Sequence, residues 1–170
     1  MKIRKAHSTD RSYIVDIYGV VADEIQDITR RPEEITNTYI FSLLNKPEDQ
    51  CIFLVVEDDD DEIIAFAHAE KIGLAAYDHI LTNYIIAVSP EVQNKGYGRG
   101  VFMGFLEYIF NERSDIQRLE MEIKHDPDRV KLFEATGFKV EAVIENRARA
   151  ANGEFYDQVL MAWTNPNFKP

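Results

Sequence analysis

The stretch VSPEVQNKGYGRG at residues 88–100 decides the fold. It follows an apolar run that stops at Ser89-Pro90, a pair that ends extended structure, and it leads into the apolar segment Val101–Phe110. The predicted order is therefore strand, loop, helix. Glycines at alternate positions let the backbone approach a ligand closely, and the start of the following helix offers unpaired N–H groups at the positive end of its dipole. Such a place suits a phosphate or pyrophosphate group.

Two common phosphate-binding patterns do not fit this loop. The phosphate loop of nucleotide hydrolases needs Gly-Lys-Ser/Thr, whereas Lys95 precedes Gly96 here. The dinucleotide fingerprint G-x-G-x-x-G needs a third glycine where this chain has Val101. The pattern that fits is Gln/Arg-x-x-Gly-x-Gly/Ala, filled by Gln93, Gly96 and Gly98. It resembles the acetyl-coenzyme A loop of the GNAT superfamily of N-acetyltransferases.

A second segment further along the chain makes the resemblance more specific. Residues 132–138 read LFEATGF, which is similar to the Leu-Tyr-x-x-x-Gly-Phe segment of that family. Residues 153–161 resemble the C-terminal hairpin of its ribosomal-protein, spermidine and small-amine branches. The resemblance implies an α/β protein with the GNAT fold, in which a mixed, mostly antiparallel central sheet of six to seven strands is flanked by about four helices. We expect a single domain over residues 1–170.

Composition and charge narrow the class of protein. The chain has 170 residues, of which 45% are hydrophobic and 29% charged, as is ordinary for one globular domain. No apolar run is long enough to cross a bilayer and the N-terminus lacks a signal-peptide core, so we expect a cytoplasmic protein. The formal net charge of -11 argues against sequence-independent binding to nucleic acid and favours a cationic partner such as an amine. The single cysteine, Cys51, fits a packing role.

The periodicity of apolar residues predicts the other elements, with glycine, proline and acidic residues at their ends. We expect helices over 13–21, from Pro32 to near Pro47, over 98–111 and from Pro127 to Gly137. We expect strands over 2–5, 51–56, 63–71, 79–88, 117–124, 138–150 and 154–163, the last two joined by a turn at Asn152-Gly153. Along 79–88 we expect side chains to alternate between the two faces of the strand, and we expect the 98–111 helix to be largely buried. The acidic run 57–62 is expected to be a solvated hairpin tip.

The resemblance implies which residues hold acetyl-CoA, the acetyl donor. Backbone groups of Ile86, Ala87 and Val88 would pair with its pantetheine arm, and an N–H near Ile86 would stabilise the developing oxyanion. The loop residues expected to bind the pyrophosphate are Gln93, Asn94, Lys95, Gly96, Tyr97, Gly98 and Arg99. Phe133 and Asp126, which stands where the family often has an asparagine, complete the expected set. No metal is expected.

Two positions depart from the usual catalytic residues of the family. Phe133 stands where many members have a tyrosine that protonates the departing sulfur, and Asn83 stands where many have a glutamate base. Phenylalanine cannot donate a proton, and an amide can orient a water but cannot keep its proton. The catalytic candidates are Asn83, His79 and Tyr156. Further polar residues considered as substitute bases are His68, Glu70, Glu120 and Glu122.

The expected function is transfer of an acetyl group from acetyl-CoA to a primary amine of a small molecule or a protein N-terminus. The alternative is a non-catalytic protein of the same fold that binds acetyl-CoA as a sensor or scaffold, because Phe133 and Asn83 depart from the pattern. An unrelated nucleotide binder is the third possibility. The expected partner is the amine acceptor, without nucleic acid or membrane, and a homodimer is left open. The pattern does not identify the amine, because variable helices and loops line the acceptor site.

Overall fold

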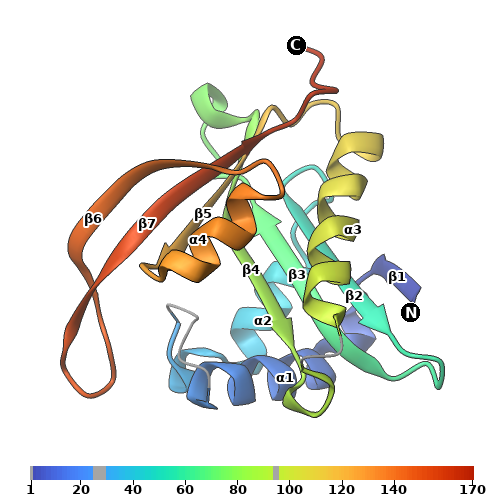
Figure 1. Cartoon of the computed structure of the whole chain (residues 1–170). Helices are drawn as coiled ribbons and strands as arrows, with labels where there is room; N and C mark the ends of the chain where they lie inside the picture. The colour runs from blue at the N-terminus through green and yellow to red at the C-terminus, as the bar shows by residue number, and fades with distance from the viewer. Residues whose placement is uncertain (1, 25–29, 94–95) are drawn as a thin grey trace. The chain divides into compact units, whose positions relative to one another are not determined.

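A computed structural model describes residues 2–24, 30–93 and 96–170 (Figure 1). Its elements are β1 (Lys2–Lys5), α1 (Arg11–Glu24), α2 (Asn37–Leu44), β2 (Cys51–Glu57), β3 (Ile63–Glu70), β4 (Ile80–Val88), α3 (Tyr97–Glu112), β5 (Arg118–Lys124), α4 (Pro127–Glu134), β6 (Lys139–Arg149) and β7 (Phe155–Thr164). The strands are hydrogen-bonded in the order β1-β2-β3-β4-β5-β7-β6. Pairs β1–β2, β2–β3, β5–β7 and β6–β7 are antiparallel, whereas β4 and β5 are parallel. The expected α/β fold, with seven strands and four α-helices among the described residues, is confirmed.

The chain divides into two compact units, which we describe separately. The first unit comprises Met1–Glu70 and Ile85–Tyr108, and the second comprises Lys71–Tyr84 and Ile109–Pro170. The first therefore holds β1 to β3, α1, α2, the end of β4 and most of α3. The second holds the start of β4, β5, α4 and the β6–β7 hairpin. The single domain expected from the sequence stays a prediction.

The core of the first unit lies between α1, α2 and one face of β2 and β3. Val55 of β2 is paired with Phe66 of β3, so their side chains and that of Phe53 point to the same face. On that face they pack against Ile14 and Tyr18 of α1, both fully buried. β2 is buried along its whole length, as expected for a strand covered on both faces.

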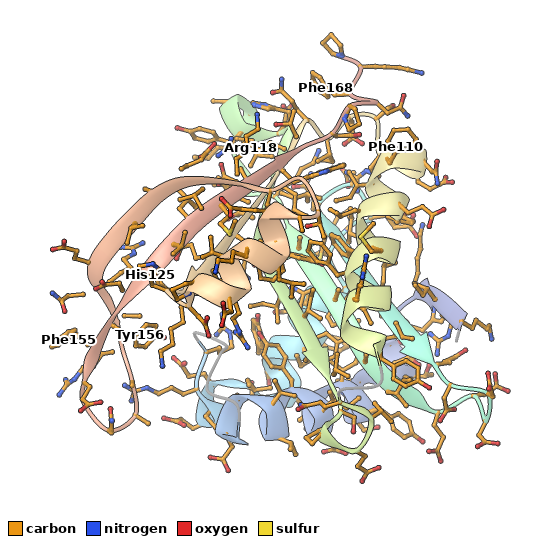
Figure 2. All side chains as sticks on the ribbon, in the orientation of Figure 1. Phe110, Arg118, His125, Phe155, Tyr156 and Phe168 are labelled. Carbon is orange, nitrogen blue, oxygen red and sulfur yellow. The ribbon has the colours of Figure 1, made fainter. Side chains whose placement is uncertain are left out.

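α3 lies close against β1 in the first unit. A Cβ atom added at Gly104 would lie 2.3 Å from Cδ1 of Ile3, so the absent side chain at Gly104 allows this approach. The expectation that this helix is largely buried is met only along one side, by Val101, Phe102, Phe105, Leu106 and Ile109. Met103 and Phe110 are 44% and 42% exposed, because the helix packs through only part of its circumference (Phe110 is labelled in Figure 2).

Arg4 links β1 to the start of α1 and to β2. Its guanidinium donates to both carboxylate oxygens of Asp10, at 2.7 and 3.1 Å, and to Glu57 at 2.6 Å. Burial alone would raise the pKa of Asp10, but hydrogen bonds from Arg4 and from a backbone amide outweigh it and lower that pKa. Hydrogen bonds from Lys2 and Arg4 lower the pKa of Glu57. Glu57 is buried and therefore does not belong to the solvated tip expected for 57–62.

The second unit is organised by β7, which pairs with both β5 and β6. The β6–β7 turn contains Gly153 with a φ of 91°, which confirms the turn predicted from Asn152-Gly153. Beyond β7 the side-chain amide of Asn165 is buried and donates to the carbonyl oxygens of Arg113 and Ile116, at 3.3 and 2.9 Å. These bonds fix the C-terminal segment to the connection between α3 and β5.

The second helix starts later than the sequence suggested. Pro32–Glu34 form only a single 3-10 turn, and α2 begins at Asn37. The hydroxyl of Thr36 accepts a hydrogen bond from the amide of Tyr39 at 3.1 Å and so caps the helix. The predicted start at Pro32 is therefore wrong, since the stronger cap lies after it. None of the helices in the described ranges is both long and apolar enough to cross a membrane.

Candidate functional site

The predicted strand, loop and helix around residues 88–100 are present in the first unit. β4 ends at Val88, Pro90–Val92 form a 3-10 turn, and α3 begins at Tyr97. The amide of Ser89 donates to the carbonyl oxygen of Ile64 in β3 at 2.8 Å, which fixes the end of β4 to the sheet. Regular structure therefore holds the loop at both ends.

The start of α3 directs backbone N–H groups toward the loop. The first hydrogen bond of the helix runs from the amide of Gly100 to the carbonyl oxygen of Gly96, at 3.1 Å. The amides of Tyr97, Gly98 and Arg99 precede this bond, so they have no partner inside the helix. With the positive end of the helix dipole they form a place that favours an anionic group.

Gly96 has a backbone conformation that favours glycine. Its φ is 86°, in the left-handed region, and a Cβ added there would meet no described heavy atom within 4 Å. Gly98 has no positive φ, and its added Cβ would lie 3.6 Å from Cγ2 of Val88, an ordinary contact. Of the three alternate glycines, only Gly96 is therefore required by its backbone conformation. The space beside it suits a ligand that approaches the main chain.

Gln93, the first residue of the acetyl-CoA pattern, connects the loop to the end of β4. Its side-chain amide donates to the carbonyl oxygen of Val88 at 3.4 Å, a long hydrogen bond across the loop. The predicted pyrophosphate-binding residues Asn94 and Lys95 lie outside the described residues. The structure thus brings Gln93, Gly98 and Val88 together on the two sides of the loop.

Asn83 interrupts β4. Its φ is 52° and its side chain is exposed, while the buried residues around it are Leu81, Tyr84 and Ala87. The expected alternation does not continue through this strand, because a left-handed residue shifts the following side chains as a bulge does. The parallel pairing of β4 with β5 covers Ile80 and Leu81, before this interruption. The irregularity coincides with the position at which the resemblance placed a base.

The other two catalytic candidates lie in the second unit. His79, just before β4, is partly exposed, and its Nδ1 lies 3.7 Å from Oδ1 of Asp78. Tyr156 lies on β7, where the ammonium of Lys124 is 5.3 Å from the centre of its ring. Figure 2 shows Tyr156 beside Phe155 on the β6–β7 hairpin. These positions leave the catalytic roles of His79 and Tyr156 as predictions.

Asp126 serves as the N-cap of α4. Its carboxylate accepts hydrogen bonds from the amides of Asp128 and Arg129, at 2.9 and 3.4 Å, and a proline follows at the first helical position. The carboxylate at this position, where the family often has an asparagine, therefore stabilises the start of α4. Phe133, on the same helix, meets the ring of Phe138 edge-on with 6.2 Å between centroids.

The carboxylates considered as substitute bases each lie near a cation. The pairs are Glu70–Lys46, Glu120–Arg118 and Glu122–Arg147, the last at 4.0 Å. His68, the remaining substitute, is fully buried in the first unit. Within the described ranges, no group of three or more His, Cys, Asp or Glu side chains could hold a metal ion.

One polar cluster was not predicted from the sequence. Tyr18 of α1, Tyr39 of α2 and His68 of β3 meet inside the first unit. In the sequence both tyrosines belong to the apolar stripes of their helices, and His68 stands alone in an apolar strand. The one local signal was tyrosine, instead of an apolar residue, at two positions that face the core.

Comparison with known proteins agrees with this architecture. Residues 3–160 match the family model described as "Acetyltransferase (GNAT) domain". A ribosomal-protein-alanine N-acetyltransferase from Brucella melitensis has a TM-score of 0.84 at 17% identity, over 96% of this chain and 99% of that chain. A phosphinothricin acetyltransferase from Sinorhizobium meliloti in complex with AcCoA has a TM-score of 0.83 at 18% identity, over 99% and 92%. A spermidine N-acetyltransferase chimera from Vibrio cholerae and hSSAT has a TM-score of 0.76 at 23% identity, over 96% and 94%. No curated protein sequence matches the chain significantly.

Proposed function

Because the chain belongs to the GNAT acetyltransferase family, we propose that it transfers an acetyl group from acetyl-CoA to a primary amine of a small molecule or a protein N-terminus. The observation that carries the proposal is the loop between β4 and α3. There a Cβ added at the left-handed Gly96 would meet no heavy atom of the described residues within 4 Å, and the first amides of α3 follow it directly. Two of the similar structures are named for amine acceptors, spermidine and a ribosomal-protein alanine, which supports an amine here.

The main chain of the first unit would bind the donor. The amides of Tyr97, Gly98 and Arg99 suit its diphosphate, because they have no partner within α3 and lie at the positive end of the helix. The backbone of Ile86–Val88 suits the pantetheine arm, which can add to a strand by main-chain hydrogen bonds. An amide near Ile86 would stabilise the charge that develops on the thioester oxygen.

Acetyl-CoA supplies an activated thioester, so that the C–N bond to the amine forms as the C–S bond breaks and a thiol is released. The chain has to accept the proton that the amine loses, and histidine is the commonest side chain in that role, which favours His79. Asn83 can orient a water, and the hydroxyl of Tyr156 can donate a proton. Phe133 cannot protonate the sulfur, but a thiol with an ordinary pKa of about 8.5 can leave as a thiolate at a moderate loss of rate.

Thiol release measured across a panel of primary amines tests the proposal. With saturating acetyl-CoA we expect release that depends on the amine and exceeds the amine-free control. Binding of acetyl-CoA without amine-dependent release would favour the non-catalytic alternative. A melting scan provides the second control, since an unrelated nucleotide binder would be stabilised equally by ATP, NAD and acetyl-CoA.

A further inference from the structure

The turn between β6 and β7 carries the only asparagine of the chain that is followed by glycine, Asn152-Gly153. Asn152 is exposed, and the backbone of Gly153 is left-handed with a φ of 91°. An asparagine amide can react with the next main-chain nitrogen, and a glycine at that position offers the least steric hindrance. The turn therefore combines the residues for a covalent change that is independent of the acetyl transfer.

Hydrogen bonds hold the reacting groups of this turn in place. The main-chain nitrogen of Gly153 donates to the carbonyl oxygen of Ala150 at 3.0 Å. The side-chain oxygen of Asn152 accepts from the amide of Glu154 at 3.0 Å, and its Nδ2 donates to Oε2 of Glu154 at 2.8 Å. The reaction needs a Gly153 nitrogen that has lost its proton and a side-chain carbon that can turn toward it. The folded turn opposes both, because the N–H is already bonded and Glu154 holds both ends of the side-chain amide.

Two charged side chains flank the reacting groups and have opposite effects. The carboxylate of Glu154 contacts the amide whose oxygen becomes negative during the attack, so it disfavours the reaction. The guanidinium of Arg149 donates to the carbonyl oxygen of Gly153 at 3.2 Å, and a cation there favours a deprotonated nitrogen. Because Arg149 also holds the turn through this bond, Glu154 is the residue whose removal tests the restraint.

We propose that Asn152 is a site of spontaneous deamidation and that Glu154 limits its rate. The nitrogen of Gly153 bonds to Cγ of Asn152, the Cγ–Nδ2 bond breaks, and ammonia leaves with the proton that the main-chain nitrogen gave up. The product is a five-membered succinimide ring. Water then opens this ring at either of its two carbonyl carbons, which gives aspartate or isoaspartate at position 152. The reaction uses water alone and needs no oxidant or reductant.

Either product weakens the hairpin at its turn. The new carboxylate adds one negative charge to a chain whose formal net charge is -11, and it replaces the group that donated to Glu154. Two carboxylates in contact repel each other. Isoaspartate also adds a methylene group to the main chain of the turn, which disturbs the 2.8 Å hydrogen bond from the amide of Ala150 to the carbonyl oxygen of Glu154.

The experiment incubates the full chain in mildly alkaline buffer and maps its peptides by mass spectrometry over time. The proteins are the wild type, Glu154→Ala and the control Glu145→Ala, which removes an exposed carboxylate of the same hairpin away from the turn. Asn146, an exposed asparagine of β6 that is followed by arginine, is the internal control. The wild type should form both products at Asn152 while Asn146 keeps its amide. Glu154→Ala should react about tenfold faster at Asn152, the effect of losing one hydrogen bond to a charged group, and Glu145→Ala should match the wild type.

Four results would overturn the proposal or one of its parts. If Asn152 of the wild type keeps its amide as long as Asn146 does, Asn152 is not a deamidation site. If Glu154→Ala reacts no faster than Glu145→Ala, Glu154 does not limit the rate. Aspartate without isoaspartate indicates direct hydrolysis and excludes the succinimide. The wild type in urea covers a Glu154→Ala variant that fails to fold: the unfolded chain should deamidate at Asn152 faster than the folded one, and equal rates overturn the restraint by the turn.

Discussion

Replacing Gly96 by alanine isolates the backbone conformation of the donor loop. A Cβ added at this glycine meets no described atom within 4 Å, so the substitution introduces no clash with the described protein. Its φ of 86° is left-handed, and for an alanine this conformation costs about 1–2 kcal/mol. If the free loop relaxes and acetyl-CoA has to restore the conformation, the dissociation constant rises about 5- to 30-fold. If the free loop stays in place, the unfolding free energy falls by the same amount.

Two titrations measure where this free energy appears. Calorimetry with CoA gives the dissociation constant, and urea unfolding of the free protein gives its stability. Gly98→Ala is the matched control, because its φ is not positive and its Cβ would make an ordinary 3.6 Å contact with Val88. Since alanine is the better helix former, this control should be as stable as the wild type or up to about 1 kcal/mol more stable. The reasoning is refuted if Gly96→Ala changes neither the affinity nor the stability.

Three further predictions concern the proton, the charges and the pH. Phe133→Tyr should raise the rate of thiol release by up to about a hundredfold, because a phenol can protonate the leaving sulfur. An unchanged rate would mean that protonation of the sulfur by residue 133 does not limit the reaction. Arg4→Ala should lower the unfolding free energy in urea by about 3 kcal/mol, because it leaves the buried carboxylate of Asp10 without its cation and leaves Glu57 paired with Lys2 alone. Lys5→Ala, the control, removes the exposed ion pair with Glu48 and should lower the unfolding free energy by less than about 1 kcal/mol. Equal losses in the two variants would contradict the stabilising role given to Arg4. Hydrogen bonding to Arg113 lowers the pKa of Asp115 to about 2, below its ordinary value of 3.8. The ion pair of Asp115 therefore stabilises the fold fully above pH 3.8, and this stabilisation is lost as the pH falls toward 2. Asp115→Asn should weaken this acid dependence, and acid titrations that superimpose would refute it.

Local signals predicted most of the fold. Asn152-Gly153 placed the last hairpin, and the glycine loop after Val88 placed the change from strand to helix. Where two helix-start signals lay within a few residues of each other, the sequence did not show which of them begins the helix. Pro32 suggested the start of a helix, but the hydroxyl of Thr36 caps it instead. Asp126 followed by Pro127 is a typical N-cap pattern, but Asp126 was considered only as a residue that contacts the cofactor.

The site was predictable as far as it depends on the main chain of one segment. The left-handed Gly96 and the first amides of α3 follow from a local pattern of glycines. The interruption at Asn83 does not, because an asparagine in an apolar strand tolerates a left-handed conformation without requiring it. The cluster of Tyr18 with His68 depends on packing between distant elements, and the helical period alone assigned that tyrosine to the core.

Amide chemical shifts of Gly96, Tyr97, Gly98 and Arg99, followed as CoA is added, test the central claim most directly. Pantetheine, which lacks the diphosphate, is the matched ligand. The account predicts that CoA shifts these four amides strongly, while pantetheine shifts those of Ile86–Val88 and leaves the start of α3 unchanged. CoA that binds without moving the amides of Gly96–Arg99 would contradict it.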